Sequence, residues 1–269
     1  MLNYLRYELH KTLKTKTLWI LLIIFLSLRA VDLITSILSD QMWSVMKYYS
    51  IYTSSAEFMF PIMGVLLATS ELSSGFMKNI YKQLKPSLFI LSKFITLLAY
   101  VLLFMILDFI LLFLANVAFG AEETLISTSE YPFSIGYLLT ICLYYFVSGC
   151  IGMAVGSLFK KQYIGIGIVL SWMLTYHMIY PLIGELVMFI NPAVMVQPGY
   201  SYADASTIYR YLHFGANYQF VIDYIRGVGV HPSTMSIWIK KFNTFFVREF
   251  IYILVCYLIC WLTLRRRRV

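Results

Sequence analysis

The sequence predicts an all-α protein that crosses a membrane six times. Of its 269 residues, 60% are hydrophobic and 13% are charged, and the mean hydropathy is +0.76. A soluble globular domain carries about 25% charged residues, so this chain has too few charges to cover a surface that faces water. Six apolar runs of spanning length and an uneven distribution of basic residues complete the prediction.

The first predicted element is an amphipathic helix at residues 2–16. Its leucines recur at helical spacing, and basic residues occupy the rest of its surface. A helix of this kind lies in the membrane interface on the side that carries anionic lipid. The alternative, a solvated basic tail, would not need leucines on one face. The apolar run that follows continues past Arg29 and Asp32 without a small-residue cleavage site, so we expect this region to be retained rather than removed as a signal peptide.

Six apolar runs fit spanning helices, each of which needs about 20 residues. They cover residues 17–38, 51–70, 90–115, 134–158, 163–189 and 249–264. The fifth run contains Pro181, which favours a kink or an early end. The sequence thus predicts one membrane domain over residues 1–269.

Basic residues predict the orientation of these spans. With both termini in the cytoplasm, the segments on the inner side carry fourteen of the 21 lysines and arginines: Arg6, Lys11, Lys14, Lys16, Lys78, Lys82, Lys85, Lys93, Lys160, Lys161 and Arg265–Arg268. The outer loop at 121–131 instead carries Glu122, Glu123 and Glu130 and no basic residue. This asymmetry is typical of a multi-pass protein with both termini inside, and it explains the net charge of +8 without a nucleic-acid partner.

A polar stretch separates the second and third runs. Ser73 or Ser74 suits a helix N-cap and Pro86 suits its end, which predicts a short cytoplasmic helix over 73–84. A long outer segment, 190–248, separates the fifth and sixth runs, and 203–214 and 217–227 fit two short helices within it. Its aromatic residues are candidates for contact with an external substrate: Tyr202, Tyr209, Tyr211, Tyr218 and Tyr224. The alternative for these tyrosines is an ordinary aromatic belt at the membrane interface.

Ionisable residues inside the predicted spans are candidate functional groups, because such groups are costly in a bilayer and are paired or face a polar cavity. They lie at similar depth on four spans: Arg29, Asp32, Glu57, Asp108 and His177. One interpretation is an ion-pair cluster that holds the bundle together, with Arg29 paired to a carboxylate. The other is that these residues line a translocation path.

The sequence lacks the motifs of several enzyme classes. It contains no phosphate-binding G-x-x-x-x-G-K-[ST] loop, no H-E-x-x-H and no G-x-S-x-G, so we expect no catalytic residue. Cys256 and Cys260 are one helical turn apart, but no His, Asp or Glu lies near them in sequence. We therefore expect all four cysteines to be buried apolar residues and no metal site. The pair Gly152-x-x-x-Gly156 would permit close helix packing, although this spacing is common in membrane helices.

An intramembrane protease of the glutamate and histidine kind is an alternative. His213-x-x-x-Asn217 and Glu122-Glu123 have the form of two of its motifs. The arginine expected after the glutamate pair is absent, since Ser127 occupies its place, and both pieces lie in predicted outer loops. The match is therefore weak.

The layout resembles the permease subunit of ABC-2 type ABC transporters. The shared features are the amphipathic N-terminal helix, the stretch at 69–93 with its glutamate, glycine and later lysine, and the large segment between spans five and six. The resemblance implies that 2–16 is an elbow helix and that 73–84 is a coupling helix for a separate ATPase subunit. The implied coupling residues are Glu71, Ser73, Gly75, Phe76, Lys78, Tyr81 and Lys82.

The resemblance also implies the partners and the cofactors. ATP and Mg²⁺ would bind to the partner ATPase and none to this chain, and a second permease copy or paralogue would complete the transporter within membrane lipid. Small members of this family export peptides or lipid-like substrates, or confer immunity to antimicrobial peptides such as lantibiotics. A composition rich in isoleucine, lysine and tyrosine favours the plasma membrane of a Gram-positive bacterium. A non-transporting immunity or sensor protein is the alternative.

Overall fold

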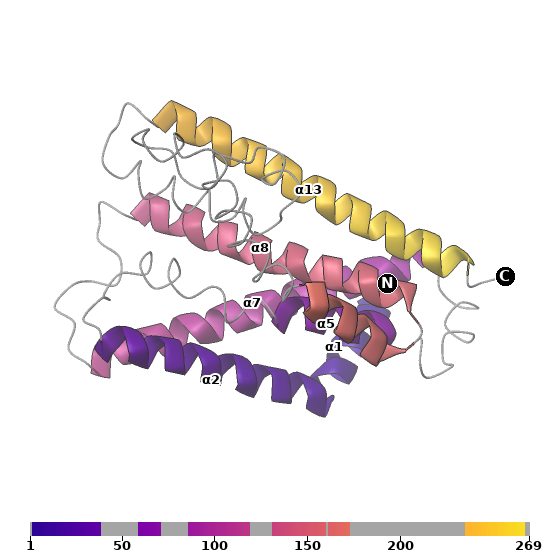
Figure 1. Ribbon diagram of the computed structural model, residues 1–269, viewed down its shortest axis with the longest axis horizontal. Helices are drawn as coiled ribbons and strands as arrows, with labels where there is room; N and C mark the ends of the chain where they lie inside the picture. The colour runs from indigo at the N-terminus through magenta and orange to yellow at the C-terminus, as the bar shows by residue number, and fades with distance from the viewer. Residues whose placement is uncertain are drawn as a thin grey trace, which may run out of the picture. The chain divides into compact units, whose positions relative to one another are not determined.

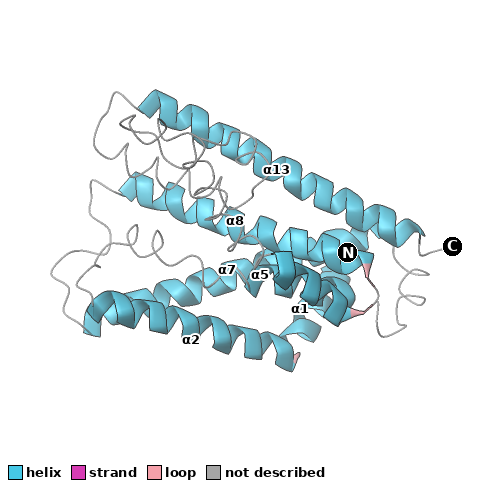
Figure 2. Ribbon diagram, viewed as in Figure 1, coloured by secondary structure: helices cyan, strands magenta, loops and turns pink. Residues whose placement is uncertain are grey.

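The computed structural model describes residues 2–38, 59–70, 86–118, 131–159, 161–172 and 235–266. These residues are helical apart from short turns, and no strand occurs among them (Figure 2). Contacts between Cα atoms divide the chain into two compact units, Met1–Val169 with Glu249–Val269, and Leu170–Arg248. An all-helical membrane protein is therefore observed, while the single domain over 1–269 stays a prediction.

The N-terminal helix and the helix after it form an elbow. Helix α1 covers Leu2–Leu13 and α2 covers Lys16–Leu38. The hydroxyl of Thr15 donates to the carbonyl oxygen of Lys11 at 2.9 Å, and the indole Nε1 of Trp19 donates to that of Leu13 at 2.8 Å. The last carbonyls of a helix have no partner inside it, so these two side chains stabilise the end of α1. The first helix thus ends at Leu13, within the predicted range of 2–16.

Three of the described helices are long and apolar enough to cross a membrane, with spans at Pro86–Leu111, Ile141–Leu158 and Phe246–Arg266. The first two belong to α7 (Pro86–Ala118) and α8 (Tyr131–Leu158). Pro86 begins α7, where its missing N–H costs nothing and its fixed φ suits the first turn. Two shorter apolar helices are α5 (Met59–Thr69) and Gln162–Trp172. Six spans in total stays a prediction.

The last helix, α13 (Met235–Arg266), starts earlier than the sequence predicts. We expected a span at 249–264 after an outer segment at 190–248, but residues 235–248 are helical and continuous with the span. The polar residues Lys240, Lys241 and Asn243 lower the hydropathy here, which hides the helix from a search for apolar runs. No glycine or proline interrupts the stretch after Pro232, so nothing in the backbone stops the helix.

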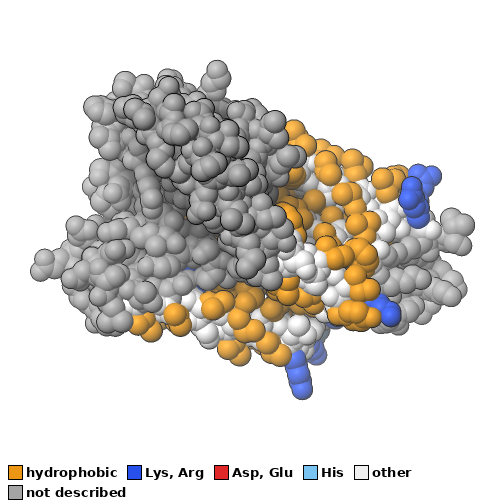
Figure 3. Space-filling view, viewed as in Figure 1, with side chains coloured by type: hydrophobic (Ala, Val, Ile, Leu, Met, Phe, Trp, Pro, Cys, Tyr) orange, Lys and Arg blue, Asp and Glu red, His pale blue; other side chains and the backbone are white. Residues whose placement is uncertain are grey.

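Helices α2, α5, α7 and α8 pack together in the first unit (Figure 1). Helix α7 shows how they share a core, since one face is buried through Phe94, Val101 and Phe104 while the other exposes apolar side chains at helical spacing. The exposed apolar residues of α7 are Leu91, Leu98, Leu102, Ile106, Ile110, Phe113, Leu114 and Val117. On the face drawn in Figure 3, the described surface is largely apolar, with lysine and arginine at its margin. Apolar side chains on the outside suit contact with lipid.

Aromatic rings from all four helices meet in the centre of this core. Phe25 of α2, Phe60 of α5 and Phe104 of α7 contact one another, with ring centroids 5.0 to 6.1 Å apart. Tyr145 of α8 stacks on Phe60 at 4.3 Å. All four side chains are at most 1% exposed. Because aromatic pairs add about 0.5–1.5 kcal/mol each to the burial of their area, this cluster fixes the positions of the four helices.

Helices α5 and α8 approach each other backbone to backbone. A Cβ on Gly152 would overlap the backbone of Pro61, and one on Gly64 would overlap the backbone of Gly149. A Cβ on Gly156 would lie 2.9 Å from the Cα of Val65. Gly64, Gly152 and Gly156 therefore form a glycine seam between α5 and α8. The Gly152-x-x-x-Gly156 spacing thus belongs to a close contact between two helices.

Candidate functional site

The deepest polar contact among the described residues is an ion pair between α2 and α7. Arg29 Nε lies 3.1 Å from Asp108 Oδ1, and Arg29 Nη2 lies 3.3 Å from Asp108 Oδ2. The two side chains are 0% and 1% exposed. This two-point geometry matches the planar guanidinium to the carboxylate and is the stronger form of such a pair. The sequence predicted that Arg29 pairs with a carboxylate, and in the structure that carboxylate is Asp108.

Helical spacing explains why this pair lies next to the aromatic cluster. Phe25 and Arg29 are four residues apart on α2, and Phe104 and Asp108 are four apart on α7, so each ring lies on the same helix face as the charge that follows it. The cluster therefore separates the pair from the N-terminal ends of α2 and α7. An ion pair that is buried next to aromatic rings is held in one geometry, and water screens the attraction between its two charges only weakly.

The other intramembrane candidates are placed only in part. Asp32 lies in α2, one turn beyond Arg29, but its side chain is outside the described residues. Glu57 and His177 also lie outside them. Whether these residues share the site of Arg29 and Asp108 stays a prediction.

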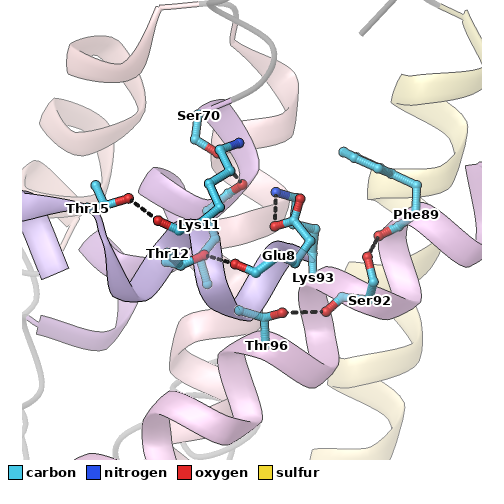
Figure 4. Close-up of polar contacts among 10 residues, drawn as sticks. Glu8, Lys11, Thr12, Thr15, Ser70, Phe89, Ser92, Lys93 and Thr96 are labelled. Carbon is cyan, nitrogen blue, oxygen red and sulfur yellow. Dashed lines mark hydrogen bonds and ion pairs between the residues drawn. The ribbon is translucent and has the colours of Figure 1, made fainter. Parts of the chain in front are cut away.

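A second buried ion pair joins the elbow helix to α7. Lys93 Nζ lies 2.8 Å from Glu8 Oε2, and the two side chains are 3% and 1% exposed (Figure 4). The ammonium group of Lys93 also lies 5.3 Å from the ring centroid of Phe89, one turn earlier on α7. Lys93 is fifteen residues before Asp108, which is roughly 22 Å along the helix. The two ion pairs thus tie α7 to its neighbours at two different depths.

Sequence reasoning missed the role of Glu8 and Lys93. Lys93 was counted among the cytoplasmic charges, but its side chain is buried against α1. The leucines of α1 were expected to face the membrane interface, and the described side chain of α1 that is fully buried in the protein is that of Glu8. One signal was available, since Glu8 is the only acid among the basic residues of 2–16. A single acid in a basic helix is a candidate for a specific partner.

The cysteines match the expectation of apolar residues in the core. Cys150, Cys256 and Cys260 are buried, Cys142 is partly buried, and all four are free thiols. Among the described residues, no group of three His, Cys, Asp or Glu side chains is arranged to hold a metal ion.

Several predicted site residues lie outside the described residues. They are the coupling residues of 71–82, the outer tyrosines from Tyr202 to Tyr224, and the protease-like motifs at 122–127 and 213–217. The site described here therefore consists of the two ion pairs, the aromatic cluster and the glycine seam.

Comparison with known families decides what kind of bundle this is. A family model described as ABC-2 family transporter protein matches residues 4–178, about two thirds of the chain. The chain belongs to this family. No curated protein matches the chain. The matched region contains α1, α2, α5, α7 and α8, and with them both ion pairs and the glycine seam.

Membership makes this chain a membrane-embedded permease component of an ABC transporter. Permeases of the ABC-2 family are typically not enzymes, and they work together with an ABC ATPase subunit.

Proposed function

We propose that this permease is the membrane half of an ATP-driven exporter, and that a separate ATPase subunit docks on residues 73–84. The observation that supports this most directly is the Glu8–Lys93 pair, because it lies on α7, the helix that follows the proposed coupling segment. Lys93 is seven residues beyond Pro86, roughly 10 Å along α7. A force applied at 73–84 would reach this pair first.

Two consecutive contacts would carry that force into the membrane. Displacement of α7 would move α1 through the Glu8–Lys93 pair and would move α2 through the Arg29–Asp108 pair. Buried ion pairs transmit displacement well, because separating the two partners leaves a buried charge without compensation, which costs about 3–5 kcal/mol. In this scheme the helices move together rather than one at a time.

The polar residues at the depth of Arg29 would line the route of the substrate. We place Asp32, Glu57 and His177 on this route with the Arg29–Asp108 pair, and we place the pathway between two six-span permease halves, identical or paralogous. The apolar exposed faces and the sparse buried charges favour an amphipathic or lipid-like substrate, such as a peptide taken from the cell membrane. Export or immunity against antimicrobial peptides in a Gram-positive bacterium fits this chemistry, with the outer tyrosines as external contacts and both termini in the cytoplasm.

Association with the ATPase is the decisive test. The tagged full-length permease is expressed in its native host and purified in mild detergent, and the proteins that remain bound are identified. We expect a P-loop ATPase to co-purify, and we expect Phe76→Ala, Lys78→Ala or Tyr81→Ala to reduce its yield by about tenfold, which corresponds to about 1.4 kcal/mol of binding.

The matched control is Lys161→Ala, which removes an exposed basic side chain of the predicted inner side outside 73–84. Equal loss of the ATPase with Lys161→Ala would show that general charge, and not the coupling segment, holds the partner. Absence of any ATPase from the wild-type preparation would favour the non-transporting immunity or sensor protein instead.

A further inference from the structure

A cavity of about 260 Å³ lies at the elbow between α1 and α2. Its walls come from α1, α2, α5, α7 and the Gln162–Trp172 helix. The polar lining residues are Lys11, Thr12, Thr15, Thr17, Ser70, Tyr100 and Gln162, and the apolar ones are Leu18, Leu21, Met63, Leu66 and Leu67. The cavity is thus lined by both polar and apolar side chains, as suits a group at the boundary between lipid headgroups and acyl chains.

One wall of the cavity carries a buried hydroxyl that lacks a hydrogen bond. Tyr100 is 2% exposed, and its Oη makes no hydrogen bond of ordinary geometry within the described part of the chain. Thr12 lies beside it, but the Thr12 hydroxyl donates its proton to the carbonyl oxygen of Glu8 at 2.6 Å and so cannot donate to Tyr100. Leaving a buried hydroxyl without a partner costs about 1–3 kcal/mol. An oxygen-bearing ligand in the cavity would remove that cost.

The same cavity has a positive charge in its wall. The side chain of Lys11 extends toward Ser70 at the end of α5, and the Thr15 hydroxyl lies at the next turn (Figure 4). The ammonium group of Lys11, the Thr17 hydroxyl and the Gln162 amide together are a set of donors that suits a phosphate group. Exposed Lys16 lies at the start of α2 beside the elbow, so the surroundings of the cavity also attract anions.

The location favours a membrane phosphate over a soluble one. The indole of Trp19, half-exposed beside the elbow, is a residue typical of the membrane interface. The positive-inside pattern puts α1 at the inner leaflet, which carries anionic lipids. At about 260 Å³ the cavity is smaller than the roughly 300–1,000 Å³ of pockets for drug-sized ligands, so it fits a headgroup whose acyl chains stay in the bilayer.

We infer that this cavity binds the phosphate headgroup of an anionic phospholipid from the inner leaflet. Lys11 pairs with the phosphate, and the Tyr100 hydroxyl donates to an oxygen of the headgroup. Leu18, Leu21 and Met63 contact the first carbons of the acyl chains. A lipid bound here stabilises the elbow against α5 and α7. The inference rests on the inner placement of α1 and is independent of the substrate and of the ATPase.

Lipid titration of the purified full-length permease tests this. The delipidated protein in mild detergent is titrated with short-chain phosphatidylglycerol, with phosphatidylcholine of the same chain length and with inorganic phosphate. Bound lipid is counted by native mass spectrometry, and thermal unfolding is measured in parallel. We expect phosphatidylglycerol to bind in a one-to-one ratio and at least about tenfold more tightly than phosphatidylcholine.

Three variants locate the site. Lys11→Gln should weaken phosphatidylglycerol binding by about tenfold, and Tyr100→Phe, which removes only the hydroxyl, by about threefold to tenfold. Lys14→Gln removes an exposed charge of the same elbow outside the cavity and should leave binding unchanged. Thermal unfolding of each variant without lipid is measured first, to show which variants fold. If Lys11→Gln does not fold, lipid binding by Tyr100→Phe decides the outcome.

Three results would overturn the inference. Equal weakening by Lys14→Gln and Lys11→Gln, with no effect of Tyr100→Phe, would show diffuse attraction to the elbow surface. Equal affinity for phosphatidylglycerol and phosphatidylcholine would show that the site does not recognise an anionic headgroup. Displacement of phosphatidylglycerol by inorganic phosphate at similar concentration would identify a soluble phosphate as the ligand.

Discussion

Arg29 and Asp108 form a two-point ion pair in which both side chains are buried. Arg29→Ala takes the guanidinium away from the buried Asp108 carboxylate, so we expect a loss of about 3–5 kcal/mol in stability. The measurement is thermal unfolding of the purified variant in detergent. The double variant Arg29→Leu with Asp108→Leu is the control, and it should recover most of the stability because it removes both charges. Wild-type stability of Arg29→Ala alone would contradict the assignment.

Glu8 should be the most sensitive residue of the elbow helix. Glu8→Gln leaves the ammonium group of Lys93 buried without its carboxylate, and we expect unfolding to become easier by about 3–5 kcal/mol, with α1 detaching first. Limited proteolysis after Arg6 and Lys11 reports the detachment. His10→Gln, on the exposed side of the same helix, keeps both cleavage sites and should leave both readouts unchanged. If the two variants behave alike, the Glu8–Lys93 pair does not hold the elbow.

At the residue level, the sequence predicted which buried charges matter but not every partner. Arg29 and Asp108 stood out because charges in apolar runs are rare, and depth alone placed them together. Lys93 did not stand out, since its position near the start of α7 looks like an ordinary inner lysine. Its burial depends on where α1 packs, and α1 reaches α7 from a distance of 85 residues in sequence. Local pattern carries no information about that contact.

The glycine seam can be tested at the level of the helix. Gly152→Ala puts a methyl group into the backbone of Pro61, so we expect a loss of at least about 2 kcal/mol in stability or misassembly of α5 and α8. Gly167→Ala is the matched control, because a Cβ on Gly167 meets nothing within 4 Å. This control should be neutral, or stabilising by up to about 1 kcal/mol from helix propensity. Equal unfolding temperatures for the two variants would rule out backbone contact along the seam.

Helix existence was easier to predict from the sequence than helix ends. Apolar runs located α2, α5, α7 and α8, because burial in lipid or core demands the same side chains along the whole helix. The predicted span at 249–264 lies within the observed span Phe246–Arg266. The helix itself begins at Met235, and this start was not predicted because residues 235–248 mix polar and apolar side chains and lower the hydropathy. The absence of helix breakers between Met235 and Arg266 was the better indicator.

The topology of the whole molecule is a separate prediction. Both termini should lie in the cytoplasm, so a fluorescent reporter fused after Val269 should fluoresce inside the cell. A cysteine introduced at Glu123 should react with a membrane-impermeant maleimide added outside. The wild-type protein is the control, because its thiols are buried or partly buried in the helices and should stay unlabelled. Labelling at Glu123 only in broken cells would place this loop inside and exclude the six-span arrangement.

The contact between α5 and α8 also determines which joints of the permease can move. Two helices that touch through their main chains have no layer of side chains between them whose rotamers could change to let them slide. They should therefore travel as one rigid body through a transport cycle. Movement would then concentrate at the boundary between the α5–α8 pair and its neighbours α2 and α7, where side chains form the contact. Spin labels on α5 and α8 should keep a constant separation while ATP turns over, and labels on α7 and α8 should not.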